Sequence, residues 1–139
     1  MDVRLIVTGF SASPNVTKED LPAVAEMGFR SVISNRLDGE DPGQASAHDM
    51  GAAAAAVGLE FVHIPVAGAG IGDAEIAALQ QALATMPGPV LGFCRSGMRT
   101  TALWALAQSG RRSPDDILRM AAGAGFDLSP IRPRLDGMS

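Results

Sequence analysis

The sequence predicts a single α/β domain built on a mostly parallel sheet of four to five strands, with helices on both faces. Short apolar runs that suit buried strands alternate along the chain with helical segments, and this alternation is typical of βαβ crossovers. The length of 139 residues fits one domain, 1–139, which can bury roughly two thirds of its unfolded surface.

The first strand is predicted at Arg4–Thr8, a β-rich apolar run. Residues 9–15, with the sequence GFSASPN, are expected to form a loop because they are dense in Gly, Ser, Pro and Asn. Thr17 is predicted to cap a helix that ends near Gly28, since acidic residues occupy its first turn.

The second strand is predicted at Ser31–Ser34, followed by the polar loop NRLDGEDPGQ over residues 35–44. Ser46 is expected to begin a helix that runs through an alanine tract to Val57, where Gly58 ends it. Small side chains on this helix favour close packing against the sheet.

The third strand is predicted at Glu60–Pro65 and leads into a glycine-rich loop, residues 66–72. Asp73 is expected to cap a helix that runs to Thr85. Prolines end this helix before the fourth strand, which is predicted at Pro89–Phe93.

A helix is predicted at Thr101–Gly110, directly after the fourth strand and a short loop. Ser113 is expected to cap the next helix, because Pro114 follows it at the first helical position. Residues 127–139 are interrupted by prolines and are predicted to form an extended C-terminal tail.

The loop between the fourth strand and its helix has the sequence CRSGMRT, Cys94 to Thr100, and holds the only cysteine of the chain. A thiolate is the reactive form of cysteine, and neighbouring arginines and a helix N-terminus favour it. Ligands of parallel α/β sheets sit at the carboxyl ends of the strands, where this loop lies. We therefore predict an anion cradle around a nucleophilic Cys94.

Composition excludes several other functions. The net charge is −4 and the cations are scattered, so no nucleic-acid surface is predicted. No signal peptide or apolar span of about 18 residues occurs, so we expect a cytoplasmic protein without membrane contact. One cysteine and two histidines without ligand spacing predict no metal site, and no cofactor is expected.

His63, on a buried strand, is interpreted as a structural, hydrogen-bonded histidine.

The loop from Cys94 to Arg99 lies between a strand and a helix and ends in arginine. In this it resembles the cysteine loops of two enzyme classes, cysteine-dependent protein tyrosine phosphatases and rhodaneses. Phosphatase loops have five residues between cysteine and arginine, whereas here four residues separate Cys94 from Arg99. This length resembles the rhodanese loop. Removing one residue shortens the contour of the loop by roughly 3.3 Å, so we expect it to enclose a smaller group, a persulfide sulfur.

The rest of the chain resembles the small bacterial family of β-lactamase-hydrolase-like proteins, also found fused to metallo-β-lactamase proteins of the persulfide-dioxygenase type. The resemblance covers about residues 5–136 and rests on the segments GFSASPNVTKEDL, GFRSVISNRLDGEDPGQ, FVHIPV, GPVLGFCRSGMRT and GFDLSPIRPRL. It implies a dual-specificity-phosphatase-like fold, and an activity of either phosphatase or sulfurtransferase type. Since the metallo-β-lactamase part and its ligands are lacking, the resemblance implies a stand-alone version, with a persulfide dioxygenase as functional partner.

A phosphatase of this fold needs a general acid, usually an Asp upstream of the cysteine. Residues 66–70 occupy the corresponding loop and carry no acid. Asp73 is the nearest carboxylate and is interpreted as a helix cap. Asp38, Glu40 or Asp41 could serve as the general acid instead, although a run of acids in that loop is more typical of a solvated turn. A sulfite leaving group needs no proton, so this pattern favours sulfur transfer.

The predicted function is therefore a sulfurtransferase that moves sulfane sulfur from thiosulfate or a persulfide to a thiol through a Cys94 persulfide. Cys94 and Arg99 are the predicted catalytic residues, and an anionic sulfur donor and a thiol acceptor are the expected partners. The residues expected to bind the anion are Arg95, Ser96, Gly97, Met98, Thr100 and, with weaker support, Arg36.

Two alternatives remain open on the sequence. A phosphatase acting on phosphotyrosine or small phosphoesters would form a phosphocysteine at Cys94. A non-catalytic module would bind an oxyanion or sense sulfur with neither activity.

Overall fold

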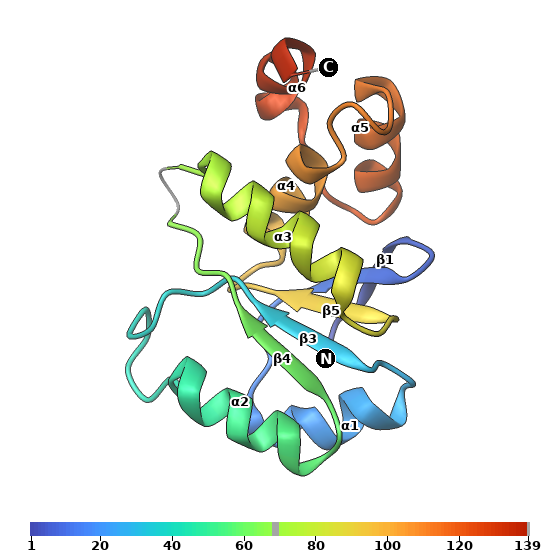
Figure 1. The fold of residues 1–139 in the computed structure, drawn as a ribbon. Helices are drawn as coiled ribbons and strands as arrows, with labels where there is room; N and C mark the ends of the chain where they lie inside the picture. Colours follow the sequence, from blue (N-terminus) through green and yellow to red (C-terminus); the bar gives the residue numbers. More distant parts are fainter. Residues whose placement is uncertain (68–69, 139) are drawn as a thin grey trace.

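A five-stranded sheet forms the centre of the molecule (Figure 1) in the computed structural model, which describes residues 1–67 and 70–138. The strands lie in the order β1-β2-β5-β3-β4. β1 is antiparallel to β2, whereas β2, β5, β3 and β4 are parallel to their neighbours. The strands are β1 Arg4–Val7, β2 Phe10–Ser13, β3 Ser31–Ser34, β4 Glu60–His63 and β5 Val90–Phe93.

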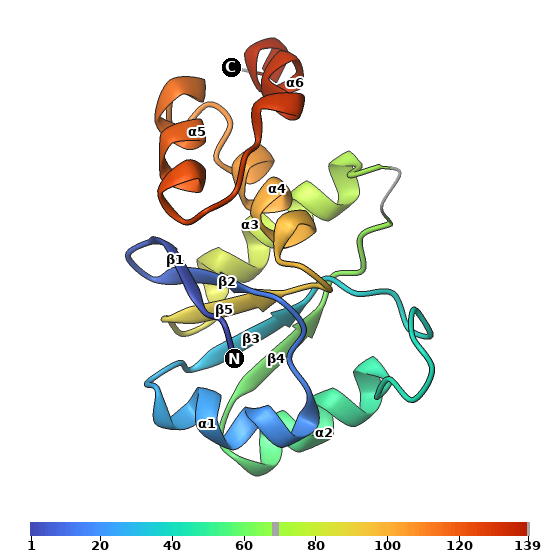
Figure 2. The same cartoon turned by 180° about the vertical axis from the view of Figure 1, so that it is seen from behind.

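Helices cover both faces of this sheet, as the two views in Figures 1 and 2 show. α1 and α2 lie on one face, and α3 and α4 lie on the other, with α5 and α6 stacked beyond α4. The predicted α/β domain with a mostly parallel sheet is confirmed. The helical segments are η1 Lys18–Asp20, α1 Leu21–Glu26, α2 Ala47–Ala56, α3 Asp73–Thr85, α4 Met98–Ala107, α5 Pro114–Gly123, η2 Ser129–Ile131 and α6 Arg132–Met138.

Each face of the sheet has its own apolar core. Leu103 and Trp104 of α4 are buried in the larger cluster, which includes residues from α3, α5 and α6. Leu21 and Val24 of α1 pack with Phe93 of β5 in the second cluster. Because both faces are covered, β5 is buried along its whole length, as expected for a central parallel strand.

β2 is the main departure from the sequence prediction, which assigns residues 9–15 to a loop. Phe10–Ser13 pairs with β5 in parallel, and all four residues are buried. Gly9 and Pro14 at its ends, and serine within it, are typical of loops. The segment nevertheless forms a strand, because it pairs with β5 and Phe10 packs into the larger core.

The C-terminal residues are helical rather than extended. Where the sequence predicts an extended tail over 127–139, the structure has η2 and α6, and Ser139 lies outside the described residues. Pro130 and Pro133 are compatible with this because each occupies the first turn of its helix, where the missing N–H costs nothing. Leu135 of α6 is 1% exposed and belongs to the larger core.

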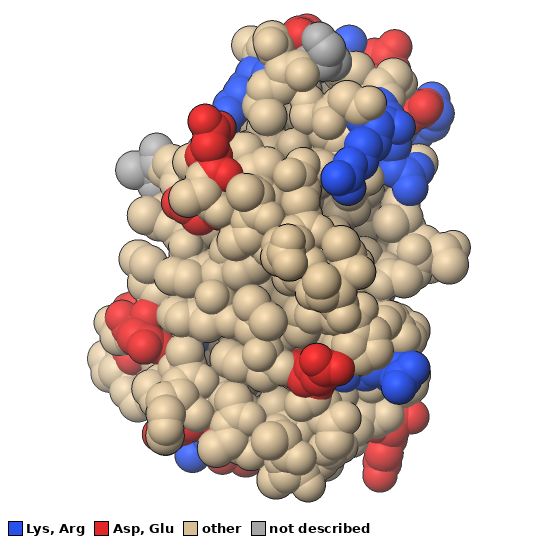
Figure 3. Space-filling model, in the orientation of Figure 1, with Lys and Arg blue, Asp and Glu red and all other residues tan. Residues whose placement is uncertain are grey.

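The surface carries its charges in small separate groups. On the face drawn in Figure 3, acidic and basic side chains are divided by wide uncharged areas. In the part of the chain that the structure describes, no helix is both long enough and apolar enough to cross a membrane.

Candidate active site

The cysteine loop lies at the carboxyl end of the central strand β5. Cys94 follows β5 directly, and Gly97 is the N-cap of α4. Backbone bonds hold the loop to both neighbouring strands. The Cys94 N–H donates to the Ser13 carbonyl at the end of β2 (3.4 Å), and the Asn35 N–H after β3 donates to the Phe93 carbonyl (2.8 Å). The loop is therefore supported from both sides.

Gly97 turns the loop so that its N–H group faces the cysteine. Its φ of +92° is a left-handed conformation that glycine adopts without strain. The Gly97 N–H donates to Cys94 Sγ at 3.0 Å, and Cys94 itself is buried. A Cβ at Gly97 would lie 2.9 Å from Cζ of Phe126, so a larger residue does not fit.

Arg99 is bound by Glu40, which comes from the loop after β3. Nη1 and Nη2 of Arg99 donate to the two carboxylate oxygens of Glu40 at 2.5 and 2.9 Å, and Nη1 also donates to the Val66 carbonyl at 2.8 Å. The Arg99 hydrogen bonds lower the pKa of Glu40 from 4.5 to about 2. The Glu40 carboxylate and, less strongly, a hydrogen bond to Cys94 raise the pKa of Arg99, so its guanidinium is in reach of the sulfur.

Arg36 holds Glu40, Asp41 and Asn15 together through its buried guanidinium. Its side chain is 3% exposed, and its three nitrogens donate to Glu40 (3.1 Å), Asn15 (2.7 Å) and Asp41 (2.5 Å). These bonds use three of the five N–H groups of Arg36. That Arg36 binds the anionic substrate stays a prediction. His63 Nε2 lies 2.6 Å from the Arg36 carbonyl oxygen, in the structural role predicted for that histidine.

Asp41 links Arg36 to the cysteine loop. One carboxylate oxygen accepts from Arg36, and the other lies 3.5 Å from Nη2 of Arg95, whose side chain is 70% exposed. The Asn15 N–H donates to the Arg95 carbonyl at 3.2 Å. Arg95 is thus fixed through its backbone and leaves its guanidinium in solvent at the edge of the site.

The remaining predicted residues support the loop. Thr100 is buried and donates to Oδ1 of Asn35 at 2.7 Å, while Nδ2 of Asn35 donates to the Ile64 carbonyl. Ser96 Oγ accepts from the Met98 N–H at 3.2 Å, so that N–H is turned away from the sulfur. The contact with Cys94 Sγ is made by the N–H of Gly97.

The sequence does not reveal the pairing of Glu40 and Asp41 with the arginines, nor the role of Asn35. All three residues lie in the polar loop after β3, which sheet topology places at the correct edge. Asn35 pairs with Thr100, 65 residues away, and Glu40 pairs with Arg99, 59 residues away. The pairs with Arg36 depend on how the loop folds back on itself. The sequence shows that this charged loop lies at the sheet edge where ligands bind, but it does not show which carboxylate pairs with which arginine.

Two other carboxylates considered as the acid lie near the starts of helices. Asp38 accepts from the Ala47 N–H at 2.8 Å, next to the start of α2. The prediction that Asp73 caps α3 is wrong, because Gly72 is the N-cap, no side-chain cap bond is made, and Asp73 is exposed in the first turn. In the loop after β4, Gly68 and Ala69 lie outside the described residues and carry no acid by sequence.

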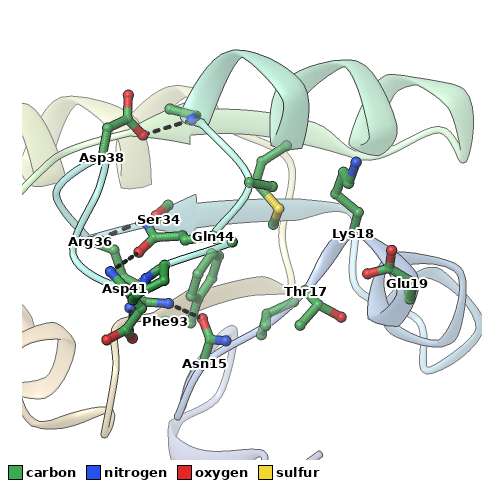
Figure 4. Close-up of a pocket in the computed structure, with 16 residues that line it drawn as sticks. Asn15, Thr17, Lys18, Glu19, Ser34, Arg36, Asp38, Asp41, Gln44 and Phe93 are labelled. Carbon is green, nitrogen blue, oxygen red and sulfur yellow. Dashed lines mark hydrogen bonds and ion pairs between the residues drawn. The ribbon is translucent and has the colours of Figure 1, made fainter.

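A cavity of about 370 Å³ lies between the segment after β2, the loop after β3 and α2, and none of the residues 94–100 lines it (Figure 4). Arg36, Asp41 and Asn15 form one wall, and Phe93 and Met50 contribute apolar surface. Figure 4 shows Arg36 directed toward Asp41 and Asn15 at the end of the cavity away from Lys18. Across residues 1–67 and 70–138, no group of three or more His, Cys, Asp or Glu side chains is arranged to hold a metal ion.

A nucleophilic cysteine and an arginine in a loop between a parallel strand and a helix define a cysteine-phosphatase-like α/β domain. The chain belongs to the family described as the beta-lactamase hydrolase-like protein, phosphatase-like domain, which matches residues 2–111. A beta-lactamase hydrolase-like protein of Agrobacterium fabrum is 40% identical over 111 residues, or 78% of this chain. The match spans 26% of the length of that relative.

Solved structures agree with this family assignment. A proposed phosphatase of Neisseria meningitidis is 29% identical, with a TM-score of 0.88 and coverage of 100% of this chain and 99% of that one. The core catalytic domain of the PP-IP phosphatase SIW14 of S. cerevisiae shares the fold at a TM-score of 0.72 and 14% identity, covering 100% of this chain and 86% of that one. The predicted dual-specificity-phosphatase-like fold is confirmed.

The predicted sulfurtransferase function is wrong. The matching family is phosphatase-like, and the solved structures that share the fold include several phosphatases. The four-residue spacing between Cys94 and Arg99 therefore does not distinguish a sulfur cradle from a phosphoryl cradle. The missing acid after β4 does not exclude a phosphatase either.

Proposed function

We propose that this chain is a cysteine-dependent phosphatase that hydrolyses a phosphate monoester through a phosphocysteine at Cys94. The observation that carries the proposal is the joint arrangement of Cys94, the Gly97 N–H at 3.0 Å from its sulfur, and Arg99. An N–H group that donates to the sulfur and an arginine at the start of the same helix suit a thiolate and the phosphoryl oxygens that would bond beside it.

Arg99 has donors left for a substrate. Of its five N–H groups, two bind Glu40 and one binds the Val66 carbonyl. The remaining two, on Nε and Nη2, form one edge of the guanidinium and are available to the sulfur and to phosphoryl oxygens. Two parallel N–H donors match two oxygens of a phosphoryl group. Glu40 can therefore keep its bonds while the substrate binds.

In the first step, the Cys94 thiolate attacks phosphorus, an S–P bond forms, and the P–O bond to the leaving group breaks. The leaving oxygen takes the bonding electron pair. In the second step, a water oxygen attacks phosphorus, the S–P bond breaks, and the electron pair returns to sulfur. The water protons pass to solvent and to the released phosphate, so the thiolate is regenerated.

The test compares the wild type with Cys94→Ser and Arg99→Lys. We expect the wild type to hydrolyse 4-nitrophenyl phosphate with inhibition by vanadate, and acid quenching to trap a phosphate adduct on Cys94 by mass spectrometry. Cys94→Ser should show neither. Arg99→Lys replaces a fork by a point charge, and loss of one such electrostatic contact typically costs about 10²- to 10³-fold in kcat.

Both variants need a folding control, which thermal unfolding of each variant provides. If folded wild-type protein gives no hydrolysis and no adduct, the proposal fails. Stabilisation by phosphate in the absence of turnover would identify an oxyanion-binding module instead.

A further inference from the structure

The cavity beside α2 combines a buried floor with an open rim (Figure 4). The rim includes Lys18 and Glu19, which are exposed. The buried residues that line the cavity are Val16, Ser34, Arg36, Met50 and Phe93. A volume of about 370 Å³ with polar and apolar groups in its floor suits a small organic molecule.

The buried polar side chains of this floor hold spare hydrogen-bond donors. Arg36 uses one N–H of each of its three nitrogens on side chains of the protein, so one N–H on each terminal nitrogen is left. The Ser34 hydroxyl oxygen accepts from the Arg36 backbone N–H at 3.4 Å, and within residues 1–67 and 70–138 its own proton has no acceptor. Buried donors without acceptors are costly, so these groups favour a ligand that supplies acceptors.

The acidic residues around the cavity oppose an anion only weakly. Arginines face both oxygens of Asp41, because Oδ2 accepts from Arg36 at 2.5 Å and Oδ1 lies 3.5 Å from Nη2 of Arg95. Glu19 and Asp38 also line the cavity, but both are exposed, and water screens their charge. The groups that a ligand meets on the buried floor are therefore donors and not carboxylates.

Apolar side chains make up the rest of the floor. Phe93 of β5 pairs in register with Ser34 of β3, so both side chains leave the same face of the sheet. Met50 of α2 lines the same cavity. A carboxylate with an apolar body matches this floor, because its oxygens can accept from Ser34 and Arg36 while its body covers the apolar side chains. One negative charge fits better than two, since the Arg36 guanidinium already binds Glu40 and Asp41.

We propose that this cavity is a second binding site, which takes a small organic monocarboxylate with an apolar or aromatic body. None of the residues 94–100 lines it, so it is separate from the cysteine loop. The two places are connected, because Nε of Arg36 donates to Glu40, and Glu40 binds Arg99. Binding at this cavity does not require the proposed phosphatase activity.

Three probes that share a phenyl ring but differ in charge test the ligand class: benzoate, benzamide and benzamidinium. The Met50 methyl signal, followed by NMR in protein labelled at its methionine methyl groups and assigned with Met50→Leu, reports occupancy of the cavity. We expect benzoate to bind with a Kd on the order of millimolar, as suits a ligand of its size, and about tenfold tighter than the other two probes. Equal or tighter binding of benzamide or benzamidinium, or a Met50 signal that benzoate does not move, would overturn the inference.

A matched pair of serine variants tests where the carboxylate binds. Ser34 and Ser11 are each 5% exposed, but Ser11 of β2 is not among the residues that line the cavity. Ser34→Ala removes a donor to a charged group, so we expect the Kd of benzoate to rise about tenfold. Ser11→Ala should leave it unchanged, and melting temperatures show that both variants are folded. Equal Kd values in the two variants would contradict this binding mode.

Inorganic phosphate separates the cavity from the cysteine loop. With two sites, the apparent Kd of benzoate reaches a plateau as phosphate is raised, and benzoate changes the affinity for phosphate by the same factor. An apparent Kd that rises in proportion to the phosphate concentration would show one shared site and overturn the inference. Absence of hydrolysis of 4-nitrophenyl phosphate would remove the proposed phosphatase function, while a cavity that binds benzoate would stand.

Discussion

Glu40 fixes the direction of Arg99, because it holds both terminal nitrogens of the guanidinium while Arg36 and the Leu37 N–H hold Glu40. A long arginine side chain otherwise loses considerable rotamer freedom when it is ordered on a ligand. Because Nη1 and Nη2 are held by Glu40, the two unbound N–H groups, on Nε and Nη2, point in one fixed direction. Glu40 is therefore a positioning residue in the proposed reaction.

Glu40→Gln should lower kcat/KM for an aryl phosphate by about 10- to 100-fold, the typical effect of losing a group that positions a reacting residue. The amide can accept one hydrogen bond from Arg99 but loses the second and the charge. We expect the decrease mainly in kcat, since Arg99 remains cationic and still attracts the anion. Steady-state kinetics of the folded variant provide the measurement.

Asp38→Asn is the matched control, because Asp38 lies in the same loop and accepts a hydrogen bond from the Ala47 N–H. Its amide oxygen can still accept that bond. If this variant loses as much activity as Glu40→Gln, the effect comes from disturbing the loop and not from the orientation of Arg99.

The same contacts make stability depend on acidic pH. The folded pKa of Glu40 is about 2, against an ordinary value of 4.5. A lowered folded pKa stabilises the fold above the unfolded pKa, and this contribution, about 3 kcal/mol in full, is lost as the pH falls from about 4.5 to 2. Urea unfolding across this range should show a steeper loss of stability for wild type than for Glu40→Gln. Parallel curves would contradict the ion pair.

Individual functional residues could be predicted only in part. Cys94 and Arg99 stand out because the single cysteine is followed by two arginines at the end of a strand. Arg36 resembled a loop arginine, yet it is buried, since three partners from the chain surround its guanidinium. Burial of a charge depends on such partners, and the sequence does not specify which carboxylate pairs with which arginine.

At the scale of elements, the cysteine loop depends on a close approach between β5 and α4. Gly92 of β5 faces Thr100 of α4, and a Cβ at Gly92 would lie 2.7 Å from Cγ2 of Thr100 and 3.1 Å from Cζ of Phe10. Thr100 has little freedom to move, because it is buried and bonded to Asn35. A small residue in the strand thus sets the position of the first turn of α4.

Gly92→Ala should therefore destabilise the protein by about 1–3 kcal/mol, the usual cost of overpacking a core. Because the added methyl group pushes on Thr100, we also expect weaker binding of phosphate, measured by the increase in melting temperature that phosphate produces. Gly123→Ala is the control, since a Cβ at Gly123 in α5 would have no neighbouring atom within 4 Å. Equal melting temperatures for both variants would show that Gly92 has room.

The order of elements was predictable where hydrophobic pattern and caps agree. Ser46 and Ser113 cap α2 and α5 as predicted, with side chains that accept from the Asp49 and Asp116 N–H groups at 3.1 Å. β2 was not predictable, because its serines suit a loop and it becomes a strand through its long-range pairing with β5. Such pairing, more than intrinsic preference, determines strand formation.

For the whole molecule, the C-terminal helices complete the core behind the active-site helix. The family match ends at residue 111, whereas α5 and α6 follow it. Ile117 of α5 and Leu135 of α6 are buried in the same cluster as Leu103 and Trp104 of α4. Since α4 carries Arg99, the packing of these helices supports the site from the far side.

Leu135→Ala tests this support. Leu135 is 1% exposed, and truncation of a buried leucine costs about 2–5 kcal/mol through lost burial and the cavity left behind. Met138→Ala in the same helix is the control, because Met138 is 38% exposed and a surface change of this kind stays within about 0.5 kcal/mol. Urea unfolding of both variants gives the comparison. A detached C-terminal tail would make the two variants equally stable, whereas a core helix makes Leu135→Ala the weaker protein by several kcal/mol.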